Sequence, residues 1–411
     1  MSWDGCRWRE DRTLDVFDRV RSTCREASAE CSRDEKTAVR LASKVTVAAV
    51  ERLIQSDRRH AATSEQWDSD PWLLNTPKGT VDLRSGKMIV HRREQYLTKL
   101  ATAGPGGECP GWRRFLDRIT AGDVELQSFL QRVMGYCLTG STKEHALFFM
   151  YGRGANGKSV ALNTIGGLLG DYARTAPVSI FTASNTDQHP TDLAGLRGAR
   201  FVPAIETEDG RWWAEAKIKS LTGGDRIPAR FMRQDFFEYV PQFKLIVAGN
   251  HKPGLRNVDE AIRRRLHLIP FNVTIGEQER DPDLAAKLMA EGPGILQWAI
   301  DGCLAWQREG LNPPAVVRDA TAEYLAAEDG FGRWLDERCA LGREYWTPGA
   351  VLFADFRQWC DEEGERPGSQ KRFTQALQAR GIEPARTENA RGFSGIRLRK
   401  DRLTHLTRIP V

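Results

Sequence analysis

The spacing of apolar residues divides this chain into regions of different texture. Alanine and charged residues recur at helical spacing between Thr13 and Ile54, which predicts an N-terminal helical region. From Trp72 to Lys87, short apolar runs are separated by Gly turns, a pattern typical of short strands. From His145 to about Thr274, strand-like runs alternate with helical stretches, which is the signature of an α/β fold.

Most of the remaining chain is predicted to be helical. The expected helices cover residues 112–119, 124–137, 282–327, 331–338, 349–363 and 369–380. A Gly-punctuated, strand-like stretch from Ile382 to Leu398 follows the last of them. Three short helices followed by a hairpin is the order of a winged helix.

The loop from Gly104 to Pro110 is the clearest predicted domain boundary, because it is rich in Gly and Pro. We expect five regions: an N-terminal domain of helices and short strands (1–105), a helical connector (106–144), an α/β core (145–285), a helical segment (286–330) and a winged-helix domain (331–411).

Composition narrows the class of protein. The 411 residues are 40% hydrophobic and 28% charged, as in soluble globular proteins. The net charge of +5 is compatible with nucleic-acid binding. Eight scattered cysteines without a C-x-x-C pair indicate neither a zinc site nor a secreted disulfide scaffold. Because the sequence lacks a signal-peptide core and a long apolar run, we expect a soluble, cytoplasmic protein without membrane contact.

The strongest motif follows the apolar run Ala146–Tyr151, where Gly152–Ser159 spells G-x-x-x-x-G-K-S before a helical stretch. In such a loop the backbone N–H groups and the helix N-terminus bind phosphate. Lys158 is expected to reach the β- and γ-phosphates and Ser159 to ligate Mg²⁺. ATP and Mg²⁺ are therefore the predicted cofactors. The predicted nucleotide-binding residues are Gly152, Gly154, Ala155, Asn156, Gly157, Lys158, Ser159 and Val160.

Three further groups fit ATP hydrolysis. The strand Ala199–Ile205 ends at Glu206 and Glu208, which we assign jointly to ordering Mg²⁺ and activating water; Glu206 is the candidate metal ligand. A solvated acidic loop is the alternative. Asn250 follows the strand Phe243–Ala248 and is a candidate sensor of the γ-phosphate, or else an ordinary turn residue. Arg264 or Arg265 could stabilise transition-state charge in a neighbouring subunit.

Together these motifs resemble the superfamily 3 helicases, specifically the phage and plasmid primase–helicase family that is related to the poxvirus primase-helicase. The resemblance runs through Gly152–Ser159, Glu206–Glu208, Lys219–Asp225, Asn250–Pro253, Arg264–Arg265 and Ile269–Phe271. It covers roughly residues 65 to 400. About 65 residues precede that region, fewer than a primase domain needs, so primer synthesis by this chain is not expected. A separate protein could supply it, and a primase or a loader protein is therefore a possible partner.

The resemblance implies an α/β fold with an AAA+-type P-loop ATPase core, a mixed α+β N-terminal domain and a C-terminal winged helix. It implies a homo-oligomeric, hexameric ring around DNA, with ATP between subunits and Arg264 or Arg265 supplied in trans. A hairpin with strands near Ala229–Arg233 and Phe236–Val240 would carry DNA-contacting residues into the channel. Arg233, Gln234 and Lys219 are the candidates; ordinary solvated side chains are the alternative.

Positive charge is concentrated near the C-terminus. Residues 369–400 carry eight Lys or Arg and two acidic residues, an excess larger than the net charge of the chain. This suits phosphate contacts by Lys371, Arg372 and Arg391, although a solvated basic surface or a protein-binding wing is also possible from the sequence.

The resulting hypothesis is a replicative helicase of a phage, plasmid or other mobile element that translocates on single-stranded and forked DNA. The alternatives are an origin-binding initiator and a packaging or remodelling ATPase. The predicted hairpin favours translocation, because a DNA-gripping element inside a channel is useful chiefly for movement along a strand.

Overall fold

The computed structural model describes residues 1–31, 34–58, 61–183, 191–205, 211–256, 258–388 and 390–399. The described residues form two compact units. The first unit takes in those of 1–253 and 264–318, and the second those of 254–263 and 319–411. The predicted boundary loop at 104–110 therefore lies inside the first unit, where Gly106 N donates to Pro293 O (3.1 Å).

The N-terminal part of the first unit has the predicted helices and short strands. A two-stranded hairpin, β1 (Ser2–Trp3) and β2 (Trp8–Arg9), precedes α1 (Asp15–Glu30), α2 (Glu35–Leu41) and α3 (Lys44–Ser56). These helices share a small core of Val20, Cys24 and Val47. An antiparallel sheet follows, in the order β3 (Leu73–Thr76), β4 (Gly79–Asp82) and β5 (Lys87–Ile89).

A four-stranded parallel sheet forms the centre of the first unit. Its order is β11 (Leu266–Pro270), β6 (Leu147–Tyr151), β10 (Lys244–Gly249) and β7 (Phe201–Ile205). All six residues of β10 are buried, as expected for a strand that pairs on both sides. Gly249 lies opposite Tyr151 and Ala248 opposite Ile205, so three strands end at the same edge.

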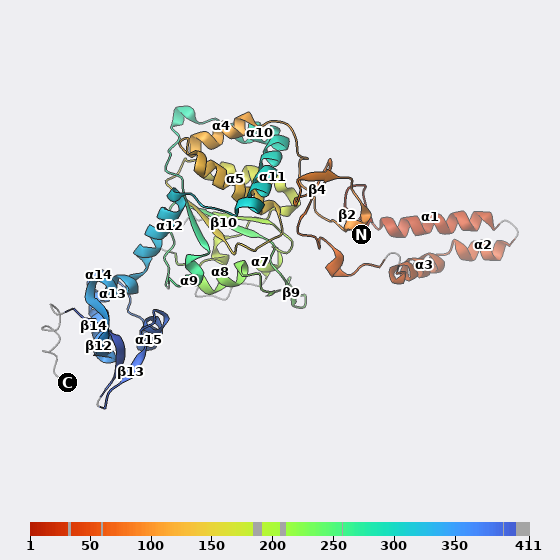
Figure 1. Cartoon of the computed structure of the whole chain (residues 1–411). Helices are drawn as coiled ribbons and strands as arrows, with labels where there is room; N and C mark the ends of the chain where they lie inside the picture. The colour runs from red at the N-terminus through yellow and green to blue at the C-terminus, as the bar shows by residue number, and fades with distance from the viewer. Residues whose placement is uncertain are drawn as a thin grey trace. The chain divides into compact units, whose positions relative to one another are not determined.

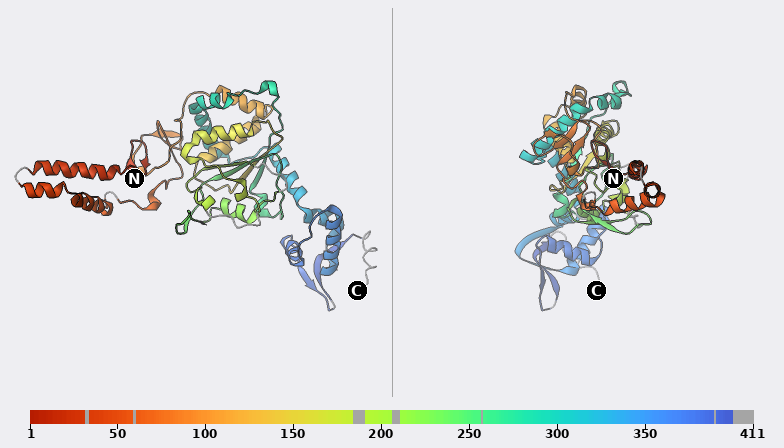
Figure 2. Two further views of the ribbon diagram at one scale, coloured as in Figure 1. Left: turned by 180° about the vertical axis from the view of Figure 1, so that it is seen from behind. Right: turned by 90° about the vertical axis from the view of Figure 1, so that its right-hand side faces the viewer.

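Helices cover both faces of this sheet (Figures 1 and 2). One face carries α4 (Pro110–Ile119), α5 (Val124–Leu138), α6 (Lys158–Leu169), α10 (Leu284–Ala290) and α11 (Gly292–Glu309). The other carries α7 (Thr191–Ala194) and α8 (Glu215–Thr222). Alternate residues of β6 serve the two faces, because Phe148 and Met150 join the core with α4, α5 and α11 whereas Phe149 contacts Trp213.

Two glycines allow α5 and α11 to pack closely. A Cβ on Gly135 would lie 2.0 Å from Cys303 N, and one on Gly302 would lie 2.1 Å from Gln131 O. Neither position has room for a side chain, so the backbones of the two helices are in direct contact.

Pro203 lies in β7, an unusual place for a residue that cannot donate to a strand ladder. The sequence indicated a bulge or one-sided pairing there. Among the described residues β7 is an edge strand, and its register with β10 is regular from Phe201 to Ile205, which favours one-sided pairing. On its open side, Arg174 N donates to Phe201 O (3.0 Å) and Ala176 N to Pro203 O (3.1 Å).

The second unit contains α12 (Ala315–Glu328) from Asp319 onward, and the first residues of that helix belong to the first unit. The other elements of the second unit are α9 (Glu260–Arg263), α13 (Gly330–Arg338), β12 (Cys339–Pro348), α14 (Gly349–Glu363), α15 (Gln370–Ala379), β13 (Pro384–Arg386) and β14 (Arg391–Leu398). The three strands form an antiparallel sheet in the order β12-β14-β13. The helices and the β13–β14 hairpin agree with the sequence prediction, which missed β12.

No helix in the part of the chain that the structure describes is long and apolar enough to span a membrane.

Two buried cations hold the edge of the central sheet that is opposite to its carboxyl ends. Arg200 directly precedes β7 and Lys244 begins β10, and each residue is 2% exposed. Arg200 donates to Leu138 O (2.7 Å), while Lys244 Nζ donates to Thr139 O and Gln242 O (3.1 Å). Because α5 ends at Leu138, the two cations satisfy carbonyls at the negative end of its dipole. Burial lowers the pKa of Lys244 to about 7.

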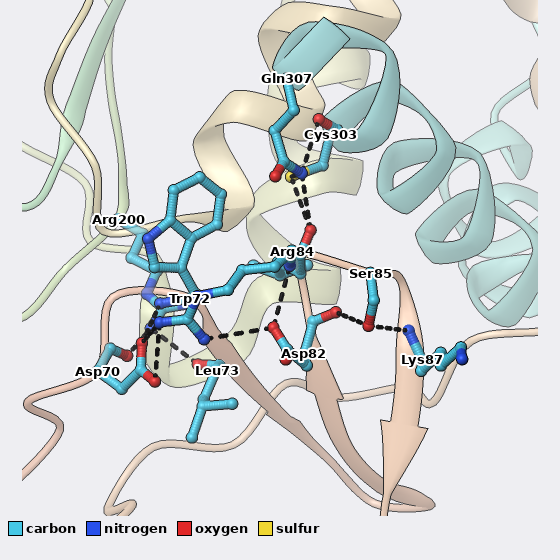
Figure 3. Close-up of polar contacts among 11 residues, drawn as sticks. Asp70, Trp72, Leu73, Asp82, Arg84, Ser85, Lys87, Arg200, Cys303 and Gln307 are labelled. Atoms are coloured by element: carbon cyan, nitrogen blue, oxygen red, sulfur yellow. Dashed lines mark hydrogen bonds and ion pairs between the residues drawn. The ribbon is translucent and has the colours of Figure 1, made fainter.

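Arg200 also connects the central sheet to β3. Its second guanidinium nitrogen donates to Leu73 O (2.8 Å), beside an exposed ion pair between Arg84 and Asp70 (2.9 Å; Figure 3). The two arginines thus contact the same turn of chain, one inside the protein and one at its surface.

This pair provides a matched test of the buried clamp. We expect Arg200→Met to lower the free energy of unfolding by at least about 2 kcal/mol, because one buried and one part-buried carbonyl lose their donor, at about 1–3 kcal/mol for a buried group. Arg84→Met is expected to cost less than about 1 kcal/mol, since its ion pair is exposed. Urea unfolding of both variants measures the difference, and equal losses would contradict the clamp.

Candidate functional site

The loop 152–157 joins β6 to α6, which confirms the predicted strand–loop–helix order. Gly152 (φ 149°) and Gly157 (φ 84°) have backbone conformations that favour glycine. A Cβ on Gly152 would lie 2.1 Å from Phe271 O, and one on Gly157 would lie 2.5 Å from Ile119 Cγ2. Both glycines are therefore required by the loop's close packing between α4 and the segment after β11.

The segment after β11 also holds the loop by hydrogen bonds. Ile275 N donates to Ala155 O (2.7 Å), although Ala155 has the left-handed φ of 59°. Asn156 Nδ2 donates to Phe271 O (3.1 Å). Hydrogen bonds within the chain therefore determine the shape of the phosphate loop, without a contribution from a ligand.

Lys158 begins α6 and turns back over the loop. Its Nζ donates to Gly152 O (2.7 Å) and to Asn156 Oδ1 (3.1 Å). The residue is 5% exposed, and desolvation lowers the pKa of its ammonium group to about 8. Both partners are neutral oxygens, so a phosphate would add the negative charge that favours the protonated form. Exposed Gly154 and Ser159 and half-buried Val160 complete the predicted set, and these groups fit a nucleotide phosphate with its Mg²⁺.

Asn250 directly follows β10 and is exposed. Because β10 lies between β6 and β7, Asn250 emerges between the start of the phosphate loop and the end of β7 at Ile205. Glu206 and Glu208 come next after Ile205 but lie outside the described residues. Lys252, to which sequence reasoning assigned no role beyond its motif, has its Nζ 4.3 Å from the ring centroid of Tyr151.

The adjacent arginines after α9 have different surroundings. Arg265 is 7% exposed, and its Nε donates to Thr222 Oγ1 (3.1 Å) at the end of α8. Arg264 is exposed. Arg263, also exposed, pairs with Asp329 (2.9 Å). Of the two predicted candidates, Arg264 is therefore the exposed one, as a side chain that acts on a neighbouring subunit has to be.

Gly223, Gly224 and Asp225, the last residues of the Lys219–Asp225 motif, follow the C-terminal end of α8. His145 Nδ1 lies 2.8 Å from Thr222 O, and Gly224 has a φ of 82°. The motif therefore joins α8 to the segment that enters β6. Lys219 lies within α8 and is half-buried, away from the hairpin that carries the other two predicted DNA contacts.

The predicted hairpin is present, with shorter strands. They are β8 (Ile227–Ala229) and β9 (Phe237–Tyr239), so residues 230–236 form the connecting loop. Arg233 has a φ of 60°, and Gln234 N donates to Phe231 O (3.2 Å), which closes a turn. Arg233 and Gln234 are both exposed in this loop, which projects beyond α7 and α8 (Figure 2).

The predicted basic residues of the second unit lie on two elements. Lys371 and Arg372 are exposed in the first turn of α15, which Ser369 caps by accepting from Arg372 N (3.3 Å). Arg391 begins β14, is exposed and pairs in register with Arg386 of β13.

Comparisons with known proteins agree with the resemblance noted in the sequence. Residues 1–121 match the family described as "D5 N terminal like", and residues 150–265 match a family of unknown function, DUF5906. The chain is 27% identical over 236 residues to a protein of Acanthamoeba polyphaga mimivirus named "Putative helicase". The matched residues make up 53% of this chain and 24% of that protein. A Frog virus 3 protein with the same description is 27% identical over 263 residues, 58% of this chain and 26% of its own length.

The matched regions therefore span about a quarter of these viral relatives. Among solved structures, the apo C-terminal region of NrS-1 is similar at a TM-score of 0.46 and 12% identity, over 71% of this chain and 76% of that one. The N-terminal family match and the shared sequence with the viral proteins thus support the resemblance to D5-like helicases.

Proposed function

We propose that this chain is an ATP-hydrolysing helicase that forms a ring and moves along DNA. The observation that carries the proposal is the shared edge of the parallel sheet, where the phosphate loop with Lys158 and the exposed Asn250 end adjacent strands. A strand order that brings a phosphate-binding loop beside a polar side chain and the end of β7, which Glu206 and Glu208 follow in the sequence, suits nucleotide hydrolysis.

ATP and Mg²⁺ would supply the phosphoanhydride and the cation that neutralises charge during its cleavage. The loop N–H groups and Lys158 would bind the phosphates, and Ser159 with Glu206 would hold the cation. Glu206 and Glu208 would orient water and accept its proton, with Asn250 as a hydrogen-bonding partner of that water. In this assignment Arg264 acts on the neighbouring subunit's nucleotide, whereas Arg265 stabilises α8 of its own chain through Thr222.

The names of the viral relatives support helicase activity, and the exposed β8–β9 loop supports contact with a DNA strand. Single-stranded and forked DNA are the proposed substrates, a hexamer is the proposed assembly, and a separate primase or loader is a further proposed partner.

Origin recognition is a second candidate role, favoured by the second unit. Its order of helix, strand, two helices and hairpin is that of a winged helix, and Lys371, Arg372 and Arg391 are exposed on it. Such a domain would hold duplex DNA through phosphate contacts.

The first experiment measures ATP hydrolysis with and without single-stranded DNA, together with strand displacement on a forked duplex. DNA-stimulated hydrolysis with displacement is the expected result. Hydrolysis without displacement would favour an initiator or remodelling ATPase over a helicase.

Lys158→Ala is expected to lower hydrolysis by at least about 100-fold, because it removes a charge that stabilises the transition state. Lys287→Ala is the matched control, since Lys287 is exposed on α10 and its ammonium group forms an ion pair with Asp281 at the surface. Steady-state hydrolysis at saturating ATP measures both variants. Activity in Lys158→Ala close to the native rate would refute the phosphate-loop assignment.

Arg264→Ala is expected to reduce hydrolysis by about 10³-fold or more while ATP binding persists. Arg263→Ala is expected to keep native activity, since Arg263 pairs with Asp329. A mixture of the Arg264→Ala and Lys158→Ala chains should recover part of the activity. At some interfaces of a mixed oligomer, Lys158 of one subunit then faces Arg264 of its neighbour. The absence of any recovery would argue against a contribution in trans.

Lys371→Ala combined with Arg372→Ala is expected to weaken duplex binding and to lower the salt dependence of log Kd by about 2, because each phosphate that a cation neutralises contributes about 0.9 to that slope. Arg357→Ala on α14 removes an exposed charge from another helix of the same unit and is the control. Titrations at several salt concentrations measure the slope. An unchanged slope in the double variant would exclude α15 as a phosphate-binding element.

A further inference from the structure

The loop of the β8–β9 hairpin exposes large apolar side chains. Met232 is 67% exposed, Phe236 61% and Phe231 40%. Exposed apolar side chains that are neighbours in space are commonly sites of contact with another molecule. Three of them occur here within six residues of a loop that also carries Arg233.

The aromatic rings of this loop are flanked by arginines. The Phe231 and Phe237 rings stack with centroids 5.8 Å apart and planes at 28°. Arg230 Cζ lies 4.7 Å from the centroid of Phe236, and Arg197 Cζ lies 5.2 Å from that of Phe237. The cation–π contacts steady the rings, yet Phe236 remains mostly open to solvent.

The loop has a defined shape. The hydrogen bond from Gln234 N to Phe231 O and the left-handed Arg233 form its turn, and the Ala229–Phe237 pair closes the strands beneath it. Ordering this loop on a ligand therefore costs less conformational entropy than ordering a flexible one.

Charge points to the kind of ligand. The loop 230–236 contains two arginines (Arg230 and Arg233) and one acidic residue, Asp235, and Arg197 lies beside Phe237. Arginines beside open aromatic rings suit a single nucleic-acid strand, whose phosphates pair with arginine and whose bases stack on rings. A duplex offers its phosphates but keeps its bases stacked on one another.

We propose that the ring of Phe236 is a stacking platform for the bases of single-stranded DNA, with the exposed Phe231 as a second aromatic ring of the same loop. The inference rests on the proposed function and deepens it, because the hairpin then binds bases as well as phosphates. Stacking tolerates any base, so the platform binds a strand of any sequence while discriminating against paired bases.

The test measures binding, without ATP, to a labelled oligothymidine and to an abasic strand of equal length and charge. The native chain binds the oligothymidine more tightly. Phe236→Ala weakens that binding by about 5- to 150-fold, the range for one stacked base, and hardly changes binding to the abasic strand. Phe236→Leu behaves like Phe236→Ala, whereas Phe236→Trp restores native binding because it keeps an aromatic face.

Two controls separate stacking from charge and from general apolarity. Arg233→Ala weakens binding to both strands and lowers the salt dependence of log Kd by about 0.7, as expected when one phosphate of a single strand is no longer neutralised. Met88→Ala, which removes an apolar side chain that is 50% exposed on β5, leaves both affinities unchanged.

Three outcomes would overturn the platform. The first is native binding by both Phe236→Ala and Phe236→Leu. The second is an equal loss for the two strands in Phe236→Ala. The third is native binding by Phe236→Leu with a changed oligomeric mass in Phe236→Ala, which would identify a protein contact instead.

The platform and the helicase assignment can fail separately. A chain that separates strands, with Phe236 variants that bind as the native protein does, would retain the helicase and lose the platform. A chain with Phe236-dependent preference for bases but no ATP hydrolysis would retain the platform and lose the helicase.

Discussion

The central position of β10 is the constraint on which the rest of the first unit depends. β10 pairs in parallel with β6 on one side and β7 on the other, and all its residues are buried. This insertion brings the ends of β6, β7 and β10 to one edge, although their sequences are far apart. At the other edge, Arg200 and Lys244 fix the starts of β7 and β10 against the end of α5. The phosphate loop and Asn250 lie at one end of the sheet because its strands run parallel, and the opposite end is anchored.

Much of this architecture follows from the sequence alone. The strands β6, β7 and β10 are continuous apolar runs, and the glycine-rich loop after β6 is unambiguous. Strand β12 was missed because Gly342, Arg343 and Glu344 interrupt its apolar pattern, and its register with β14 is irregular between Leu341 and Trp346. The hairpin strands that the resemblance implied were placed too near the tip, because Phe231, Met232 and Phe236 are exposed loop residues.

Some residues of the candidate site were likewise predictable from the sequence, and others were not. Lys158 and Asn250 were predictable because their motifs are local and follow strands. Arg264 and Arg265 are indistinguishable in sequence, and only the tertiary contact of Arg265 with Thr222 separates them. Arg200 and Lys244 carried no signal at all, because their main partners are backbone carbonyls, which leave no mark in the side-chain sequence.

Pro203 has a consequence for how copies of this chain can associate. An open sheet edge ordinarily offers N–H and C=O groups to a strand of another molecule, which risks aggregation. On the open side of β7, the carbonyls of Phe201 and Pro203 already accept from Arg174 and Ala176, and Pro203 has no N–H to offer. Another chain therefore finds few free backbone groups at this position of the edge. In the proposed ring, neighbouring copies would therefore meet through side chains rather than by extending this sheet at β7.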